Sequence, residues 1–212
     1  STRVRSSAAS DVYKRQTNDS LTDKKIYEQA GKILREGGLV AFPTETVYGL
    51  GADALDEEAS AKIYAAKGRP SDNPLIVHIA DIEALYKLSC EVPDKALKLA
   101  DKFWPGPLTM ILKKSDIVPD SITGGLGTVA IRMPSHKVAA ELIRTSGVYI
   151  AAPSANTSGK PSPTRASHVI KDLSGKIDMI IEDDTVDIGV ESTIIDLSEE
   201  VPTILRLSLI HI

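Results

Sequence analysis

The chain is poor in cysteine and in aromatic residues: its 212 residues include one cysteine, one tryptophan, two phenylalanines and six tyrosines. A single cysteine, Cys90, excludes a disulfide framework and a zinc site built from several cysteines. We expect Cys90 to be a buried, inert thiol, and the protein to lie in the reducing cytoplasm. So few aromatic side chains argue against a stacking surface for single-stranded nucleic acid. Because no apolar run approaches the ~20 residues of a membrane span, we expect no membrane partner.

Several common catalytic motifs are also missing. The chain has no G-x-x-x-x-G-K-[ST] segment, which excludes the familiar P-loop. It has no G-x-S-x-G segment to indicate a serine hydrolase. No H-E-x-x-H or comparable spacing of metal ligands occurs, so we expect no metal site made by the protein itself.

The charge balance is acidic over most of the chain. The net charge is −4, but residues 1–16 hold four cations and one acidic residue, which leaves −7 for the rest. An acidic body is a poor general binder of nucleic acid. Residues 1–18 and 207–212 do not continue the patterns beside them, so we expect both segments to be non-native or disordered. Residues 19–206 are then one catalytic domain.

Helical and strand-like segments alternate along that domain. Asp56 precedes a helical pattern as an N-cap, and Gly68 follows it as a C-terminal breaker. Short strands mixed with helices of ~10–15 residues predict an α/β fold, and closely spaced strands near the C-terminus predict a mixed sheet. Helices are expected over 23–36, 57–67, 81–88, 93–103, 134–146 and 164–173, and strands over 39–42, 75–79, 108–112, 128–132, 148–151, 179–181, 192–197 and 203–206.

Two short segments suggest a phosphate site. Lys67 and Arg69 flank a glycine where a helix ends, and two neighbouring cations suit a nucleotide triphosphate. Lys67 alone could simply complement the helix dipole, and Asn73 could be a turn residue. Ser154 and Asn156 follow a strand and could bind phosphate or sugar, or form an ordinary turn.

Other polar residues could serve a second ligand. The loop over 43–51 carries Thr46 and Glu45, and Glu45 could bind a metal or an amino group, or face solvent. Arg132 ends a strand and could clamp a carboxylate, or form a surface ion pair. His78 lies in an apolar strand, where a hydrogen-bonded core histidine and a functional histidine are both open readings.

Together these residues resemble one family, the YrdC-like L-threonylcarbamoyladenylate synthases. Lys67-x-Arg69 and Ser154-x-Asn156 look like the two halves of its KxR…SxN signature. Four further motifs are similar to the family's in the same order: P-T-E-T-V-Y-G-L at 43–50, P-L-I-V-H at 74–78, W-P-G-P-L-T at 104–109 and E-S-T-I at 191–194. The resemblance covers roughly residues 26–206. After Arg206 the chain departs from the family pattern, which continues with proline and glycine, and longer members add a linker and another domain.

The resemblance implies a reaction in which L-threonine, bicarbonate and ATP give threonylcarbamoyl-AMP, pyrophosphate and water. It implies a twisted mixed sheet with a deep central cavity, and Mg²⁺ on the phosphates of ATP. A separate transferase would then pass the threonylcarbamoyl group to the adenosine beside the tRNA anticodon, and a weak contact with tRNA is compatible with this role.

Carried over position by position, the resemblance assigns two sets of ligands. The threonine pocket would contain Thr46, His78, Arg132, Ala152 and Ser192. The ATP site would contain Lys67, Arg69, Asn73, Thr128, Ser154, Asn156, Ser162 and Arg206. Of these, Lys67, Arg69, Ser154 and Asn156 would be the catalytic set.

Two other functions compete with this one. A paralogue could hold structured RNA without making the adenylate, but the acidic body disfavours it and the intact signature favours catalysis. A detached domain of a larger carbamoyl-transfer protein is disfavoured because no zinc-finger or acylphosphatase-like sequence flanks the domain.

Overall fold

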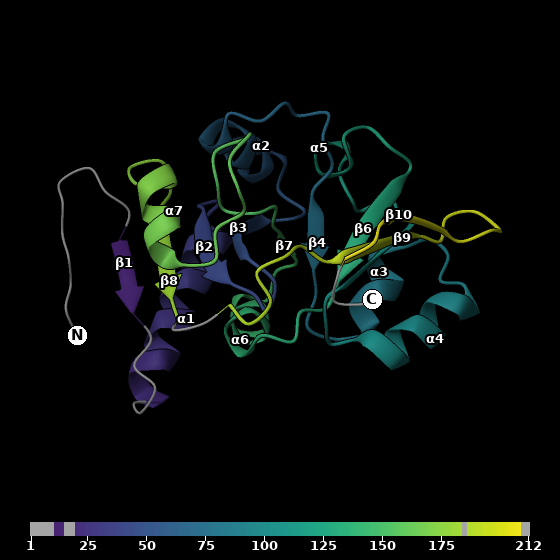
Figure 1. The fold of residues 1–212 in the computed structure, drawn as a ribbon, viewed down its shortest axis with the longest axis horizontal. Coiled ribbons are helices and arrows are strands. Elements are labelled where there is room, and N and C mark those ends of the chain that lie inside the picture. The colour runs from purple at the N-terminus through teal and green to yellow at the C-terminus, as the bar shows by residue number, and fades with distance from the viewer. Residues whose placement is uncertain (1–10, 15–19, 184–185, 209–212) are drawn as a thin grey trace.

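The structure, a computed structural model, describes residues 11–14, 20–183 and 186–208. These residues form one ten-stranded sheet in the order β1-β8-β2-β3-β7-β4-β6-β5-β9-β10 (Figure 1). The pairs β1/β8, β2/β8, β4/β6 and β5/β9 are parallel, and the other neighbouring pairs are antiparallel. The predicted mixed α/β sheet is therefore confirmed.

The elements have the following bounds. The strands are β1 (Asp11–Lys14), β2 (Val40–Pro43), β3 (Tyr48–Asp53), β4 (Ile76–His78), β5 (Leu108–Lys113), β6 (Thr128–Arg132), β7 (Ile150–Ala151), β8 (Met179–Glu182), β9 (Thr193–Asp196) and β10 (Thr203–Arg206). The helices are α1 (Ser20–Arg35), α2 (Glu57–Lys67), α3 (Glu83–Leu88), α4 (Asp94–Phe103), α5 (Asp120–Thr123), α6 (Lys137–Ser146) and α7 (Ala166–Leu173).

The apolar core has one cluster on each face of the sheet. Successive residues of a strand point to opposite faces, and Val40 and Phe42 belong to one cluster whereas Ala41 belongs to the other. Helices α1 and α6 pack on each other and supply the cluster that contains Phe42. Helices α2, α3, α4 and α7 supply the larger cluster on the opposite face.

Helix α2 begins and ends where its sequence predicts. The Asp56 side chain accepts hydrogen bonds from the backbone N–H groups of Glu58 and Ala59, which are otherwise unpaired in a first turn. At the other end Gly68 has φ +60°, a left-handed conformation that costs glycine little. This turn reverses the chain directly after Lys67 and fixes the direction in which Arg69 leaves the helix.

Several expectations need correction. The segment predicted as a loop over 43–51 contains the start of strand β3, and the predicted strand over 148–151 shortens to β7. Helix α5 was not predicted, and Cys90 is exposed rather than buried. The terminal segments 1–18 and 207–212 fall largely outside the described residues, although β1 lies in the first of them.

Candidate functional site

A cavity of about 330 Å³ lies over the middle of the sheet, within the usual size range of ligand sites. Alternate residues of β4 and β6 share one face of the sheet, and this places His78 beside Arg132 at the cavity wall. Larger hollows exist elsewhere on the surface, but this one gathers the side chains of three arginines. The predicted site residues that line it are Thr46, Arg69, Asn73, His78, Arg132, Ala152, Ser154, Ser192 and Arg206.

One end of the cavity is built around the buried guanidinium of Arg132. Its Nη1 donates to Thr46 Oγ1 at 3.0 Å, and its Nη2 lies 2.7 Å from Glu45 Oε1. Arg132 and Glu45 therefore form a buried ion pair. Among the described residues the buried Nε of Arg132 has no acceptor, so it can still donate to the carboxylate of a ligand.

The Arg132–Glu45 pair settles two alternatives that the sequence left open. Arg132 is 4% exposed, which excludes a surface ion pair, and Glu45 is also 4% exposed, which excludes a solvent-facing role. Burial alone would raise the pKa of Glu45, but Arg132 outweighs it and holds the pKa below its usual value. The Glu45 carboxylate is therefore ionised at neutral pH.

His78 is an uncharged hydrogen-bonding group in this wall. Burial, reinforced by the nearby Arg132, lowers the pKa of His78 to about 3, although Glu45 acts in the opposite direction. Its Nδ1 lies 3.2 Å from the Ile76 carbonyl, which can only accept, so Nδ1 carries the proton. The Phe42 and His78 rings form a T-shaped pair, with their centroids 6.4 Å apart and their planes at 89°.

The remaining two arginines, Arg69 and Arg206, also line the cavity. Arg69 Nη2 donates to the Pro74 carbonyl at 3.3 Å, and among the described residues its buried Nε has no acceptor. Arg206 donates from Nε to the Ser192 carbonyl at 2.8 Å and from Nη2 to Ser192 Oγ at 3.2 Å. Tyr64 donates its hydroxyl to the Asn73 carbonyl, which secures the segment beside Arg69.

Four predicted ATP residues do not line the cavity. Thr128 shares a face of β6 with Arg132 and lies further along the strand. Ser162 donates to the carboxylate of Glu191 at 2.6 Å, and Glu191 itself lines the cavity. The other two, Lys67 and Asn156, are buried behind the cavity wall at 2% and 6% exposure.

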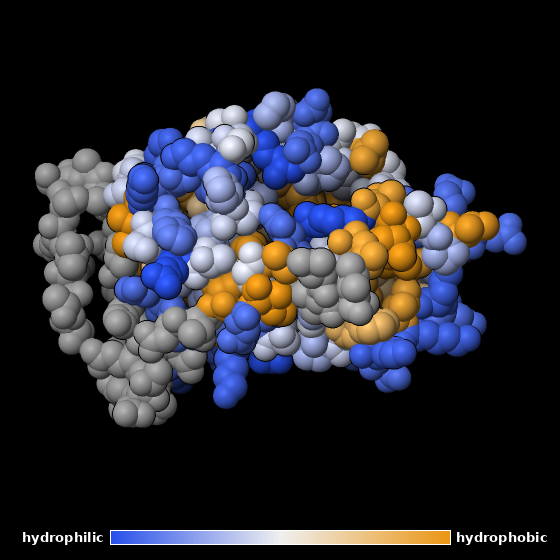
Figure 2. All heavy atoms as spheres, in the orientation of Figure 1, coloured by the Kyte–Doolittle hydropathy of each residue, from blue (hydrophilic) through white to orange (hydrophobic). Residues whose placement is uncertain are grey.

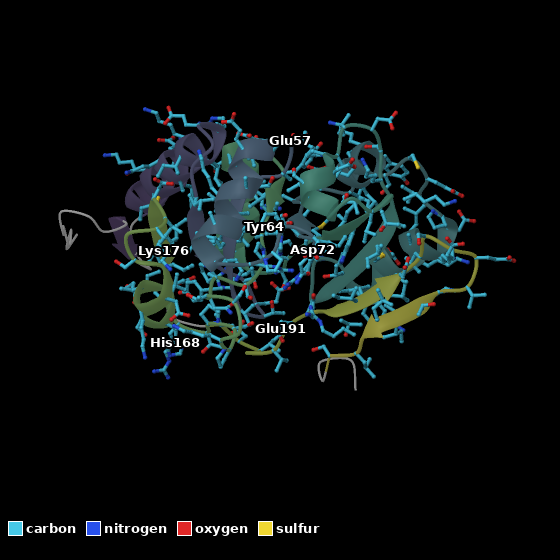
Figure 3. All side chains as sticks on the ribbon, turned by 90° about the horizontal axis from the view of Figure 1, so that it is seen from above. Glu57, Tyr64, Asp72, His168, Lys176 and Glu191 are labelled. Carbon is cyan, nitrogen blue, oxygen red and sulfur yellow. The ribbon has the colours of Figure 1, made fainter. Side chains whose placement is uncertain are left out.

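Glu191 is a cavity residue that was not predicted from the sequence. Glu191 is the first residue of the E-S-T-I motif, and membership of that motif is the sequence feature that could have identified it as a site residue. Figure 3 labels Glu191, Tyr64 and Asp72, which lie toward the middle of the molecule between the two halves of the sheet, while His168 and Lys176 lie at the periphery. No cluster of three or more potential metal ligands occurs among residues 11–14, 20–183 and 186–208.

The surface around the cavity mouth is partly apolar. Leu205 of the edge strand β10 lines the cavity and is exposed, and Ile204, Leu207 and Val201 nearby in sequence are exposed too. Figure 2 shows apolar residues gathered on the part of this face where β10 lies. In the described part of the chain, no helix combines the length and hydropathy that crossing a membrane requires.

Known proteins are similar to this chain over nearly its whole length. A threonylcarbamoyl-AMP synthase of Pyrococcus abyssi is 60% identical over 89% of this chain, and one of Bacillus subtilis is 56% identical over 90%. The crystal structure of P. abyssi Sua5 complexed with L-threonine superposes with a TM-score of 0.87 at 56% identity, covering 92% of this chain and 56% of that one.

This chain spans only about half the length of the first two relatives, 55% in each case. A putative threonylcarbamoyl-AMP synthase of Methanocaldococcus jannaschii is 37% identical, with 83% of its length covered. The sequence profile of the Sua5/YciO/YrdC family, described as telomere recombination, matches residues 32–208. With that match and these relatives, the chain belongs to the Sua5/YciO/YrdC family.

Proposed function

We propose that this chain catalyses the formation of threonylcarbamoyl-AMP and pyrophosphate from L-threonine, bicarbonate and ATP. The observation that carries the proposal is a single cavity lined by Arg132, whose buried Nε has no acceptor among the described residues, together with two further arginines. The relatives named threonylcarbamoyl-AMP synthase and the P. abyssi structure with L-threonine support it.

Threonine would occupy the end around Arg132. The substrate carboxylate would accept from the Nε–H of Arg132, while Glu45 and Thr46 hold Nη2 and Nη1 in place. His78 and Ser192 would offer uncharged hydrogen bonds to the rest of the amino acid, with the backbone of Ala152 closing this pocket. Because the Glu45–Arg132 pair is neutral overall, the pocket would recognise the carboxylate by direction more than by net charge.

ATP would occupy the part of the cavity lined by Arg69 and Arg206. Arg69 and Arg206 present planar forks of N–H donors, which suit phosphate oxygens. Asn73 and Ser154 add uncharged hydrogen-bonding groups from two loops. Thr128 and Ser162 would complete the nucleotide site from the β6 face and from the Glu191 side.

The chemistry follows from this arrangement of two ligands. The threonine nitrogen bonds to the carbon of carbon dioxide or bicarbonate, and water leaves in the overall balance. An oxygen of the resulting carbamate then attacks the α-phosphorus of ATP, and the bond to pyrophosphate breaks. Neither step needs a covalent enzyme nucleophile, so positioning and charge neutralisation would supply most of the rate.

Mg²⁺ is expected with ATP, and the cavity is compatible with it. Glu191 is the only carboxylate among the described residues that line the cavity. Mg²⁺ is commonly held by one or two carboxylates together with substrate phosphates, so Glu191 is the residue that would hold it. Bound there, the ion would neutralise charge on the phosphates.

The proposed product also defines the proposed partners. A separate transferase would carry the threonylcarbamoyl group to tRNA, with at most a weak tRNA contact by this chain. The low cysteine content makes the cytoplasm the proposed compartment.

The deciding experiment is incubation of the protein with ATP, ¹⁴C-bicarbonate and L-threonine, followed by separation of threonylcarbamoyl-AMP and measurement of pyrophosphate. We expect both products only when threonine is present. A folded protein that makes neither product would refute the proposed function.

An Arg132→Gln variant tests the assignment of the two ends. We expect threonine affinity to fall roughly 10- to 100-fold, because a charge-assisted contact contributes ~1.5–3 kcal/mol, while ATP affinity changes little. Arg144→Gln is the matched control, because Arg144 is an exposed arginine on α6. Isothermal titration calorimetry with each ligand separately gives the measurement, and equal losses for both ligands would contradict the assignment.

A further inference from the structure

In each of the K-x-R and S-x-N segments, the two signature residues lie in different surroundings. Arg69 and Ser154 line the cavity, whereas Lys67 and Asn156 are buried behind it. The left-handed turn at Gly68 separates the two cations, so one faces into the protein and the other toward the ligand. Each segment therefore contributes one residue that lines the cavity and one residue that is buried in the protein.

The Lys67 ammonium is already bound to the loop over residues 154–160. Its Nζ donates to the carbonyl oxygens of Ser154 and Asn156, the latter at 2.6 Å. In return the Ser158 N–H donates to the Lys67 carbonyl at 2.9 Å. The end of α2 and the 154–160 loop are thus joined by hydrogen bonds in both directions.

Several other polar groups of the 154–160 loop are also engaged, although the buried Asn156 Oδ1 has no partner among the described residues. Asn156 Nδ2 donates to the carbonyls of Thr157 and Lys160 at 2.9 and 2.8 Å. Asp172, on α7, accepts from the Thr157 N–H at 3.3 Å and from Lys160 Nζ at 2.7 Å. These contacts fix the loop from behind and leave the side chain of Ser154 toward the cavity.

The buried charge of Lys67 has no ion-pair partner in the part of the chain that the structure describes. A buried ammonium is costly unless its donors are satisfied. Here two of the three N–H donors bind carbonyl oxygens, and the positive charge lies directly behind the loop that faces the proposed phosphate site. An anionic ligand in front of the loop would stabilise that charge.

We propose that Lys67 and Asn156 are positioning residues that hold the 154–160 loop, and that Arg69 and Ser154 are the signature residues that contact the nucleotide. The inference rests on the proposed ATP site. Arg69 and Ser154 would contact ATP, whereas Lys67 and Asn156 would support the loop. Lys67 would then affect ATP affinity through the position of Ser154.

A double-mutant cycle on ATP affinity tests the coupling. We expect Lys67→Met to weaken ATP binding about tenfold or more and to change threonine affinity less than about twofold. Adding Ser154→Ala to Lys67→Met should cause little further loss, because the loop that presents Ser154 is already released. Adding Arg69→Ala should multiply the loss, because Arg69 binds independently. If the Lys67 and Ser154 effects multiply instead, or if Lys67→Met leaves ATP affinity unchanged, the proposal is wrong.

A control lysine is available on the same helix. Lys62 also donates to a backbone carbonyl, that of Gly37 at 2.6 Å, but it lies away from the cavity. Lys62→Met should leave ATP affinity unchanged.

The pH dependence of ATP affinity tests the charge itself. Burial and the nearby Arg69 lower the pKa of Lys67 to about 8, and Asp172 opposes them. ATP affinity of the wild type should begin to decline near pH 7 and fall further through pH 8 to 9 as Lys67 loses its proton, whereas Lys67→Met should show no such decline. The pKa of Tyr64, which contacts the neighbouring segment, lies above its usual value near 10 and outside this window. Identical profiles for the two proteins would refute a role for the charge.

Hydrogen exchange of the free protein separates this inference from the proposed function. Amides of the 154–160 loop should exchange faster in Lys67→Met and in Asn156→Ala, and at the wild-type rate in Arg69→Ala. This readout needs no ATP, so it still decides the positioning role if the wild type does not bind ATP. Asn156→Ala serves in place of Lys67→Met should the latter fail to fold, and unchanged exchange in both variants would overturn the proposal.

Discussion

At the scale of single residues, the site depends on charges that are buried together. Glu45 and Arg132 are each 4% exposed and in ion-pair contact at 2.7 Å. The removal of one partner from such a pair commonly costs ~3–5 kcal/mol, because the other charge stays buried and unpaired. Replacement of both by neutral groups of similar volume avoids that penalty.

This gives a prediction for the stability of three variants. Arg132→Met should lower the free energy of unfolding by about 3–5 kcal/mol, and Glu45→Gln by a similar amount. The double variant should lose clearly less than the sum of the two single losses. Urea unfolding at pH 7 gives the three values, and a strictly additive double variant would show that the two side chains do not interact as the structure indicates.

His78 predicts a pH dependence of stability. Its pKa is about 3 in the folded protein and ~6.5 in the unfolded chain, so between these values the unfolded chain binds more protons. Its contribution is therefore fully present above pH 6.5 and is lost progressively as the pH falls toward 3. The loss should amount to a few kcal/mol in total.

The comparison of wild type with His78→Gln isolates this contribution from that of other groups. The wild type should lose about 1–2 kcal/mol more than the variant between pH 7 and pH 5. Urea unfolding at the two pH values provides the measurement. Parallel losses in both proteins would show that His78 titrates normally when folded.

The sequence indicated which residues belong to the site better than it indicated where their side chains point. The motif placed Lys67 and Arg69 together, and both were expected at ATP, yet only Arg69 lines the cavity. The difference is the left-handed turn at Gly68 and the position of the 154–160 loop, which is 87 residues away in sequence from Lys67 where the two meet at Ser154. Such a non-local contact leaves no trace in local spacing.

At the scale of elements, two left-handed glycines differ in what surrounds them. Gly68 ends α2 at φ +60°, and Gly124 ends α5 at φ +63°. A Cβ at position 68 would meet no atom within 4 Å, whereas one at position 124 would lie 2.5 Å from the Asp72 carbonyl oxygen. The Gly124 site therefore adds a backbone clash to the conformational strain.

Alanine substitutions should separate these two costs. Gly68→Ala should lower the free energy of unfolding by about 1 kcal/mol, the usual cost of a left-handed non-glycine residue. Gly124→Ala should cost more than this, and it should also weaken ATP binding, because Asp72 adjoins the cavity residue Asn73. Urea unfolding and calorimetry measure the two effects, and equal stability losses would contradict the packing at Gly124.

Strand β3 shows why local propensity failed at one element. Its sequence, Y-G-L-G-A-D, contains two glycines, which are depleted in strands, so it was predicted as loop. In the structure a Cβ on Gly51 would lie 2.8 Å from the Phe42 ring and 2.7 Å from Ile150. Glycine is required there for close packing between strands, and that tertiary reason overrides propensity. The caps of α2 are local signals, and they were predicted correctly.

At the scale of the whole molecule, the sheet has two halves that meet at its shortest strand. β7 has two residues and pairs with β4 only through Ala151 with Val77 and Ile150 with His78. The strand order across this junction could not be predicted from sequence, because it joins segments that are far apart along the chain. The class of mixed sheet could be predicted, because alternating helices and strands are local patterns.

The cavity spans this junction. Thr46, Arg69 and Ser154 come from segments attached to the β2-β3-β7 half, and Arg132 and Arg206 come from the β4-β10 half. A ligand that contacts both sets should hold the two halves together. Because threonine and ATP would share the cavity, their effects on the junction should reinforce each other.

Threonine and ATP together should stabilise the protein and protect the junction between the two halves of the sheet. Each ligand at 100 times its dissociation constant should stabilise the folded state by ~2.7 kcal/mol, so the midpoint of unfolding should rise with either and rise further with both. Hydrogen exchange should slow at the junction amides, including that of Ala152, which donates to the Ile76 carbonyl at 2.9 Å. The Arg144→Gln control should respond like the wild type. Binding that raises the midpoint but leaves the junction amides exchanging at their free rate would place the ligands on one half of the sheet and contradict a cavity shared between the halves.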